Sequence, residues 1–552
     1  PLAHVATRTD RLALLLDRLD ELPLRHHDLG GRPAVLLSAL IARIDEMKGG
    51  GAGASDVRAW AAGLPEGEQR TVREREFAEL MAVHDRLLEA QGLLDAGEVV
   101  LRAAQLLERR DDVRERVGAR WRHLLADDLE DATSAQLRFV ELLTAPHGDL
   151  VAVIDDDPAT RTGSARITAL TAHGIGGHRT DVIDMGASVR CPPQVSAAAQ
   201  GAAGLWSAPP ATGTDVRAWR CESTVTEAGA VAARVAELIA QGEPPEEIAV
   251  IVPSVRRDGQ QIASALQDRA IPHRLSGTAA LLGQAEVRDV IAWLRLLSDP
   301  SDASAAVRAL TRPPLEVHSI DVARCLQIAR RRKLDMVRGL SAATEAPQLP
   351  PEARERVVLF LRQYERLAAG LDGTRPDLFV HQLIEELGLR RRHVFAAQAD
   401  VIERLRGLAQ NYSERVPQAT ARDFANWLAS LADVGLEVDD DPHERPRGVT
   451  VIELEASKGR EWRHVLLCGL SDAQIPGRMR SRPIPVPAEL LGMAEPQDDA
   501  DEVGDEQLVL ARRLLRIGIS RASRSLVLSF AAEGPSGAPR GPAPIADAAR
   551  AG

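Results

Sequence analysis

Residues 123–136 read HLLADDLEDATSAQ, a short apolar run that ends in two adjacent carboxylates, Asp127 and Asp128. Residues 150–157, LVAVIDDD, repeat the pattern of an apolar run followed by acidic residues. Buried parallel strands have this pattern when their carboxyl ends open onto a ligand crevice. The two stretches therefore predict an α/β fold, and paired carboxylates at a strand end can hold Mg²⁺ through a water. A solvated acidic turn before a helix explains the first stretch equally well.

The rest of the chain extends this α/β pattern. Further strand-like runs lie at 121–126, 247–253, 449–454, 464–469 and 525–530. Helical periodicity predicts helices at 9–48, 74–110, 227–241 and 506–520, and through nearly all of 300–445. The glycine-rich residues 49–55 and the Gly/Pro-rich residues 533–544 are typical of a flexible loop and a tail or linker. We therefore expect two α/β units, with a long helical insertion in the second.

Composition excludes several classes of protein. The 552 residues suggest three or four globular units, and 45% hydrophobic with 27% charged residues excludes a wholly disordered or collagenous chain. No run of about 18 apolar residues and no signal pattern marks the chain as membrane-spanning or secreted.

Four widely spaced cysteines fit a reducing cytoplasm. The net charge of −12 argues against a coat-like nucleic-acid binder but not against a basic groove. Because the chain begins with Pro1, we expect a fragment or a processed product.

A second candidate site lies at 449–462, VTVIELEASKGREW, where a strand runs into a Lys-Gly turn. Lysine occurs only at Lys48, Lys333 and Lys458, so its presence here is conspicuous. Lys458 could meet a phosphate, and Gly459 could let the backbone approach a ligand closely. A β-turn with a solvated lysine is the plainer explanation.

A third candidate is the arginine-rich helix at 511–522, ARRLLRIGISRA. An arginine delivered from one domain onto a nucleotide held by another acts as an arginine finger. An ordinary basic surface helix has the same pattern.

In this order and spacing, the three stretches resemble motifs II, V and VI of superfamily I DNA helicases of the UvrD/PcrA/Rep type. Residues 151–161, VAVIDDDPATR, are similar to motif III, and residues 188–195, SVRCPPQV, to motif IV. The resemblance covers about residues 70 to 545.

The resemblance implies two RecA-like parallel-sheet domains of the P-loop NTPase type, with helical insertions called 1B and 2B. The implied domains are a 1B-like region at 1–112, the remainder of 1A at 113–205, the first part of 2A at 206–299, 2B at 300–445, the second part of 2A at 446–532, and a flexible tail at 533–552.

The resemblance also implies roles for individual residues. Asp127 would organise Mg²⁺ and Asp128 would be a weakened general base. Arg190 and Arg521 would contact the γ-phosphate of ATP from the two sides of the cleft.

The resemblance implies that three further residues bind the cofactor or shape its site. Glu461 would touch the ribose, while Lys458 and Gly459 would shape the motif V turn. Carboxylates at Glu453 and Glu455 replace the usual threonine and histidine, and they would repel a DNA backbone.

Several residues differ from the helicase motifs at positions that matter for ATP binding and hydrolysis. None of the three lysines stands in a GxxGxGK[ST] P-loop, the segment that holds the ATP phosphates, so this loop lies before Pro1 or has been lost. Asp128 replaces the usual glutamate, Ala159 or a neighbour replaces the motif III glutamine, and Val189 replaces the adenine-stacking tyrosine.

We therefore expect a cytoplasmic, N-terminally truncated ATP-dependent helicase chain that tracks 3′ to 5′ along single-stranded DNA. A nuclease domain or subunit is a possible partner, and no membrane is expected. The alternative is a catalytically inactive scaffold of a helicase–nuclease complex that binds DNA or a partner. A decayed gene product without activity is the third hypothesis.

Overall fold

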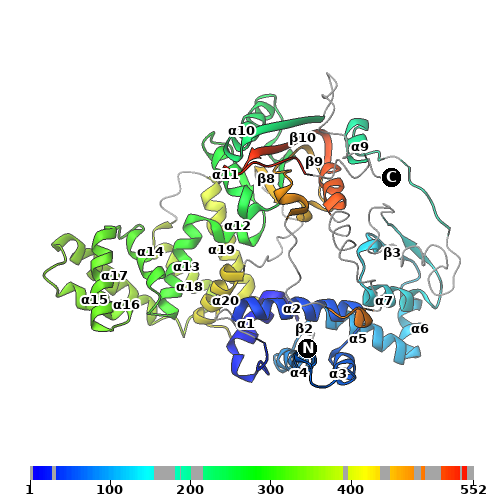
Figure 1. The fold of residues 1–552 in the computed structure, drawn as a ribbon, viewed down its shortest axis with the longest axis horizontal. Helices are drawn as coiled ribbons and strands as arrows, with labels where there is room; N and C mark the ends of the chain where they lie inside the picture. Colours follow the sequence, from blue (N-terminus) through cyan, green and yellow to red (C-terminus); the bar gives the residue numbers. More distant parts are fainter. Residues whose placement is uncertain are drawn as a thin grey trace. The chain divides into compact units, whose positions relative to one another are not determined.

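The computed structural model describes residues 4–27, 33–154, 181–186, 188–200, 216–389, 396–434, 448–477, 486–491, 511–534 and 537–543. The chain divides into two compact units (Figure 1). The sheet unit comprises Pro1–His273 and Arg445–Gly552, and the helical unit comprises Arg274–Glu444. Parallel sheets and many helices occur together, which confirms the predicted α/β class.

The first part of the sheet unit is mainly helical. Its elements are β1 (His4–Ala6), α1 (Arg8–Asp17), α2 (Pro33–Gly50), α3 (Ala54–Ala62), α4 (Gln69–Ala90), β2 (Leu93–Asp95), α5 (Ala96–Arg109) and α6 (Asp111–Arg120). The single helix predicted at 9–48 is wrong, because α1 ends at Asp17 and α2 begins afresh at Pro33, a favoured first helical residue. The predicted loop at 49–55 is shorter, since α2 continues through Gly50.

The acidic stretches follow a small parallel sheet. Strand β3 (Leu124–Ala126) pairs in parallel with β4 (Leu150–Ala152), and α7 (Ser134–Thr144) connects them. The predicted burial of these strands is wrong, because Leu125 is 77% exposed and Val151 is 54% exposed. Among the described residues these two strands pair only with each other, whereas buried parallel strands have neighbours and helices on both faces. Asp155, Asp156, Asp157 and Ala159 lie outside the described residues.

A larger sheet forms the core of the sheet unit. Six described strands take the order β5-β10-β9-β6-β8-β7. They are β5 (Val216–Ser223), β6 (Ile248–Val252), β7 (His273–Leu275), β8 (Val449–Glu453), β9 (Trp462–Leu467) and β10 (Ala522–Glu533). Helices α9 (Pro193–Gln200), α10 (Thr224–Ala240) and α11 (Gln260–Gln267) belong to the same region. Every residue of β6 is buried, as its unbroken apolar run predicts for a central parallel strand.

Residues 511–519 form a helix directly before β10. Gly518 lets this helix approach the sheet closely, because a Cβ there would lie 2.4 Å from Leu454 Cδ1. Residues 537–543, part of the expected flexible tail, instead fold back along the strand ends. The Ala543 N–H donates to the Leu470 carbonyl at 2.9 Å, and the Ala543 side chain is buried in the core.

The helical unit has only helices and turns among its described residues, apart from the end of β7. Its helices are α12 (Thr278–Gly283), α13 (Ala285–Ser298), α14 (Ala303–Thr311), α15 (Ser319–Arg332), α16 (Met336–Thr344), α17 (Pro351–Ala368), α18 (Pro376–Glu386), α19 (Ala396–Arg415) and α20 (Ala421–Val434). The helix-rich prediction for 300–445 holds for these residues. The expected boundary at residue 300 falls inside the unit, between α13 and α14.

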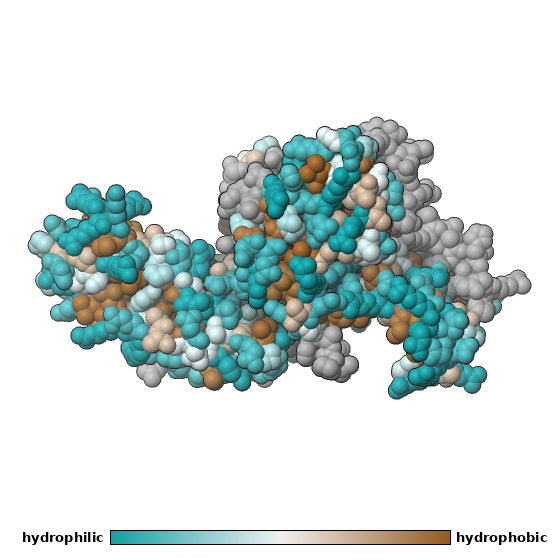
Figure 2. Space-filling model, turned by 90° about the horizontal axis from the view of Figure 1, so that it is seen from below, coloured by the Kyte–Doolittle hydropathy of each residue, from teal (hydrophilic) through white to brown (hydrophobic). Residues whose placement is uncertain are grey.

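Aromatic packing holds the helical unit together. Tyr412, Phe424 and Trp427 form one buried group, with ring centroids 4.9 to 5.5 Å apart. The face of the chain seen in Figure 2 is mostly hydrophilic, with patches of hydrophobic residues between the hydrophilic ones. No described helix is both long enough and apolar enough to cross a membrane. All four cysteines are free thiols, in line with the sequence prediction.

Candidate functional site

The residues after β3 form a short acidic loop, Asp127–Asp131. Asp128 adopts a left-handed backbone conformation with φ 53°, and its N–H donates to Asp127 Oδ1 at 3.0 Å. A 3-10 turn then begins at Leu129, whose N–H donates to the Val153 carbonyl beside the end of β4 at 3.2 Å. The loop is thus tied to both strands of the small sheet, and the side chains of Asp127 and Asp128 remain exposed.

Two cations from distant parts of the sequence meet the acidic loop. Lys458 Nζ lies 3.1 Å from Asp128 Oδ1, and it also pairs with Asp131. Arg513 pairs with Asp131, and its Nη2 lies 3.5 Å from Glu130 Oε1. Lys458 follows β8 and Arg513 belongs to the helix at 511–519, so elements of the larger sheet supply both cations.

These ion pairs set the charge state of the groups. Burial alone would raise the pKa of Asp131, but hydrogen bonds from Lys458 and Arg513 outweigh it and lower that pKa. Burial alone would lower the pKa of Lys458, but its hydrogen bonds to Asp131 and Asp128 raise it. Asp131 is therefore an ionised carboxylate near neutral pH, paired with two cationic side chains.

Arg190 and Arg521, the two arginines predicted to contact phosphate, both hydrogen-bond to Ser520. Arg190 Nη2 donates to the Ser520 carbonyl at 3.0 Å. Arg521 donates to the carbonyls of Ile517 and Arg460, at 2.9 and 3.1 Å. Burial, followed by the charge of Arg190, lowers the pKa of Arg521. The two arginines therefore lie next to each other at the end of the helix at 511–519, and their contact with a γ-phosphate from two sides of a cleft stays a prediction.

The reason lies in residues 188–200, which pack on the larger sheet rather than on the small one. The side chains of Cys191 and Val195 are buried in the same core cluster as Leu526 and Ile519. Residues 191–200 therefore belong with the larger sheet, although the resemblance assigns 113–205 to domain 1A. Val189, the replacement for the stacking tyrosine, is fully exposed.

The Lys-Gly turn connects β8 with β9. A 3-10 turn at Glu455–Ser457 precedes Lys458, and Gly459 follows with φ 76°, a left-handed conformation that favours glycine. Glu461 is exposed next to this turn. Glu453, expected to repel a DNA backbone, instead accepts a hydrogen bond from the Val255 N–H at 2.9 Å.

The described residues do not form a ready site for ATP and Mg²⁺. Asp127 is exposed and has no ion pair with a described residue, so it is free to hold a hydrated cation. The other three carboxylates of the acidic loop, however, are engaged by Lys458 and Arg513. The sequence also lacks a P-loop lysine.

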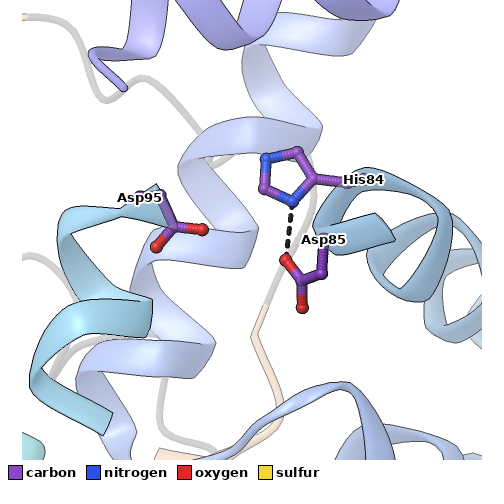
Figure 3. A group of neighbouring side chains, drawn as sticks. All are labelled: His84, Asp85 and Asp95. Atoms are coloured by element: carbon purple, nitrogen blue, oxygen red, sulfur yellow. Dashed lines mark hydrogen bonds and ion pairs between the residues drawn. The ribbon is translucent and has the colours of Figure 1, made fainter. Parts of the chain in front are cut away.

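A metal-like cluster that sequence reasoning missed lies elsewhere, at His84, Asp85 and Asp95 (Figure 3). One possible ligand atom of each residue lies within 4.8 Å of the others. However, Lys48 Nζ already lies 2.7 Å from Asp85 and 2.6 Å from Asp95. Arg11 Nε donates to His84 Nε2 at 2.9 Å, so His84 Nδ1 donates to Asp85 at 2.8 Å. The cluster is an internal ion network, in which the Lys48 ammonium supplies positive charge where a metal ion would lie.

The chain matches family models along most of its length. The model described as "UvrD/REP helicase N-terminal domain" matches residues 36–159, and "UvrD-like helicase C-terminal domain" matches residues 200–533, more than half of the chain. The helicase resemblance and the predicted RecA-like fold class are thereby confirmed.

Curated relatives agree with the family models. The chain is 23% identical to DNA helicase II of Haemophilus influenzae, over 83% of this chain and 62% of that protein. It is 24% identical to ATP-dependent DNA helicase Rep of Escherichia coli, over 95% of this chain and 75% of that protein. For ATP-dependent DNA helicase UvrD1 of Mycobacterium tuberculosis, the values are 24%, 83% and 61%. The chain thus spans less than two thirds of helicase II and UvrD1, and it belongs to the UvrD-like helicase family.

Proposed function

We propose that the chain is the motor portion of a DNA helicase that hydrolyses ATP and moves 3′ to 5′ along single-stranded DNA. The observation that carries the proposal is the meeting of three sequence segments in one unit. Lys458 and Arg513 bring the motif V turn and the motif VI helix onto the acidic loop of motif II. In this chain the three segments therefore lie together even though single motif residues differ from the family pattern.

The proposal assigns the following roles. Asp127 organises Mg²⁺, and Asp128 is a weakened general base because its side chain is one methylene shorter than glutamate. Arg190 and Arg521 contact the γ-phosphate. A second group of cofactor-binding residues serves the ribose and the shape of the turn: Glu461, Lys458 and Gly459.

The proposal also requires a P-loop, and we infer that polypeptide outside these 552 residues supplies it. The exposed apolar side chains of Leu125 and Val151 support this inference, because parallel strands are normally covered on both faces. The match to DNA helicase II of Haemophilus influenzae covers only 62% of that protein, which supports the inference as well.

The test combines DNA binding, ATP turnover and unwinding by a polypeptide that joins this chain to a P-loop segment. Binding of labelled oligo-dT should weaken steeply with salt. A duplex with a 3′ tail should be unwound in preference to one with a 5′ tail. Arg521→Ala should lower turnover on the order of 10³-fold, whereas Arg512→Ala should have little effect. Equal turnover in Arg521→Ala and the unchanged protein would contradict the assignment.

A second candidate is a catalytically silent scaffold in a helicase–nuclease complex. It is favoured by the engagement of the acidic loop by Lys458 and Arg513, together with the absent P-loop lysine. Single-stranded DNA binding without ATP turnover, even with a P-loop segment joined on, would support the scaffold.

A further inference from the structure

We propose that Lys458 and Arg513 form a clasp on the acidic loop, occupying the place of a divalent cation. Mg²⁺ binds there only after Lys458 leaves Asp128, so the clasp is an internal competitor of the metal. This inference rests on the proposed function only for the identity of the metal. The ion pairs themselves do not depend on it.

The charge balance supports a competition. Among the described residues, the three carboxylates of Asp128, Glu130 and Asp131 form ion pairs with two cations, Lys458 and Arg513, and the charge of Arg521 acts on Asp128 without an ion pair. Asp127 adds a fourth carboxylate without an ion pair to a described residue. The loop therefore keeps an excess negative charge while the clasp is closed, and that excess attracts a hydrated divalent cation.

The clasp joins parts of the fold that belong to different sheets. The acidic loop ends a strand of the small sheet, whereas Lys458 and Arg513 are carried by elements of the larger one. Opening the clasp removes the contacts of Asp131 to both cations. Metal binding to the loop is consequently coupled to the connection between the two sheets.

The strength of the ion pairs suits a reversible contact. The side chain of Lys458 is 29% exposed, and that of Asp128 is 55% exposed. The pairs of Lys458 with Asp128 and Asp131 are therefore weak and screened by salt, whereas the side chain of Glu130 is only 5% exposed. A divalent ion carries twice the charge of the ammonium that it displaces. It also coordinates carboxylate and water oxygens at the same time.

The test uses Mn²⁺ as the probe and measures its binding to the full chain by electron paramagnetic resonance at low salt. The double variant Lys458→Ala/Arg513→Ala should bind Mn²⁺ about tenfold more tightly than the unchanged protein, since two competing charges are gone. Asp128→Asn added to this variant should remove the gain. The matched control is Arg512→Ala, a neighbouring arginine without an ion pair to a described residue, which should leave affinity unchanged.

Two results would overturn the clasp: equal Mn²⁺ affinity in the double variant and the unchanged protein, or an equal gain from Arg512→Ala. If the double variant does not fold by circular dichroism, Lys458→Ala alone decides, with an expected gain of about threefold. Since the readout is metal binding, the outcome does not depend on whether the chain turns over ATP.

Discussion

Two of the three lysines in this chain each face three carboxylates, yet their surroundings differ. Lys48 Nζ lies within 2.8 Å of carboxylate oxygens of Asp85, Asp95 and Glu98. Lys458 pairs with Asp128, Glu130 and Asp131. The side chain of Lys48 is 0% exposed, whereas that of Lys458 is 29% exposed. Burial, rather than the number of partners, separates a structural ion cluster from a reversible one.

The physical reason is the availability of water as a replacement partner. Burial alone would lower the pKa of Lys48, but Asp85 and Asp95 outweigh it and raise that pKa, so the ammonium stays charged. The side chains of Lys48 and Asp95 are both 0% exposed, so neither can be solvated if the other is lost. At Lys458, water can reach the ammonium and the carboxylates of Asp128 and Asp131, so these two contacts can open without a large penalty.

The largest expected effect comes from breaking the buried cluster. Lys48→Met leaves the carboxylates of Asp85 and Asp95 without their cation, and it should lower the free energy of unfolding by about 3–5 kcal/mol. Urea unfolding followed by circular dichroism measures this loss. Lys333→Met, at the end of α15, is the matched control and should stay within about 0.5 kcal/mol. A loss below about 1 kcal/mol for Lys48→Met would contradict the structural role.

A smaller effect concerns pH, through His84. Desolvation by burial lowers the pKa of His84 despite its hydrogen bond to Asp85, so the folded protein keeps the ring neutral. Below a pH of about 6.5, the unfolded chain takes up a proton that the folded chain refuses, and stability falls as the pH drops. His84→Asn should flatten this fall by up to about 1.4 kcal/mol per pH unit between pH 6.5 and 5. An unchanged slope in urea unfolding would mean that His84 is protonated in the folded protein.

The smallest effect belongs to the clasp. Lys458→Met should change the free energy of unfolding by only about 0–1 kcal/mol at low salt, because Lys458 and two of its partners, Asp128 and Asp131, are partly exposed. In 0.5 M NaCl the difference should vanish, since screening weakens the pairs in the unchanged protein as well. Parallel urea titrations at the two salt concentrations measure it. A loss of 3 kcal/mol that is insensitive to salt would place Lys458 in the same class as Lys48.

The fold was largely readable from the sequence, because strand runs such as 449–454 and 525–530 are apolar and bounded by turns. Their parallel pairing agrees with the α/β reading. The exposure of β3 was not readable, since an apolar run does not reveal whether a neighbouring strand covers it. The packing of residues 537–543 was hidden too, because a Gly/Pro-rich composition describes local flexibility and not the contact of Ala543 with the core.

The candidate site was predicted residue by residue but not in its contacts. The proximity of Arg190 to Ser520 depends on residues 330 positions apart, which a local pattern does not encode. The network around Lys48 was missed for the same reason, since its carboxylates lie on α4, at the end of β2 and on α5. The scarcity of lysine was the one available signal, and it drew attention only to Lys458.

The most direct test of this contrast uses the fact that the chain has only three lysines. Limited acetylation of the folded protein, read by mass spectrometry, gives a rate for each amine. At low salt Lys333 should react fastest, Lys458 more slowly because its ion pairs raise its pKa, and Lys48 not at all. In 0.5 M NaCl the rate at Lys458 should approach that at Lys333, while Lys48 stays protected. Equal rates at Lys458 and Lys333 in low salt, or acetylation of Lys48 in the folded protein, would contradict the account.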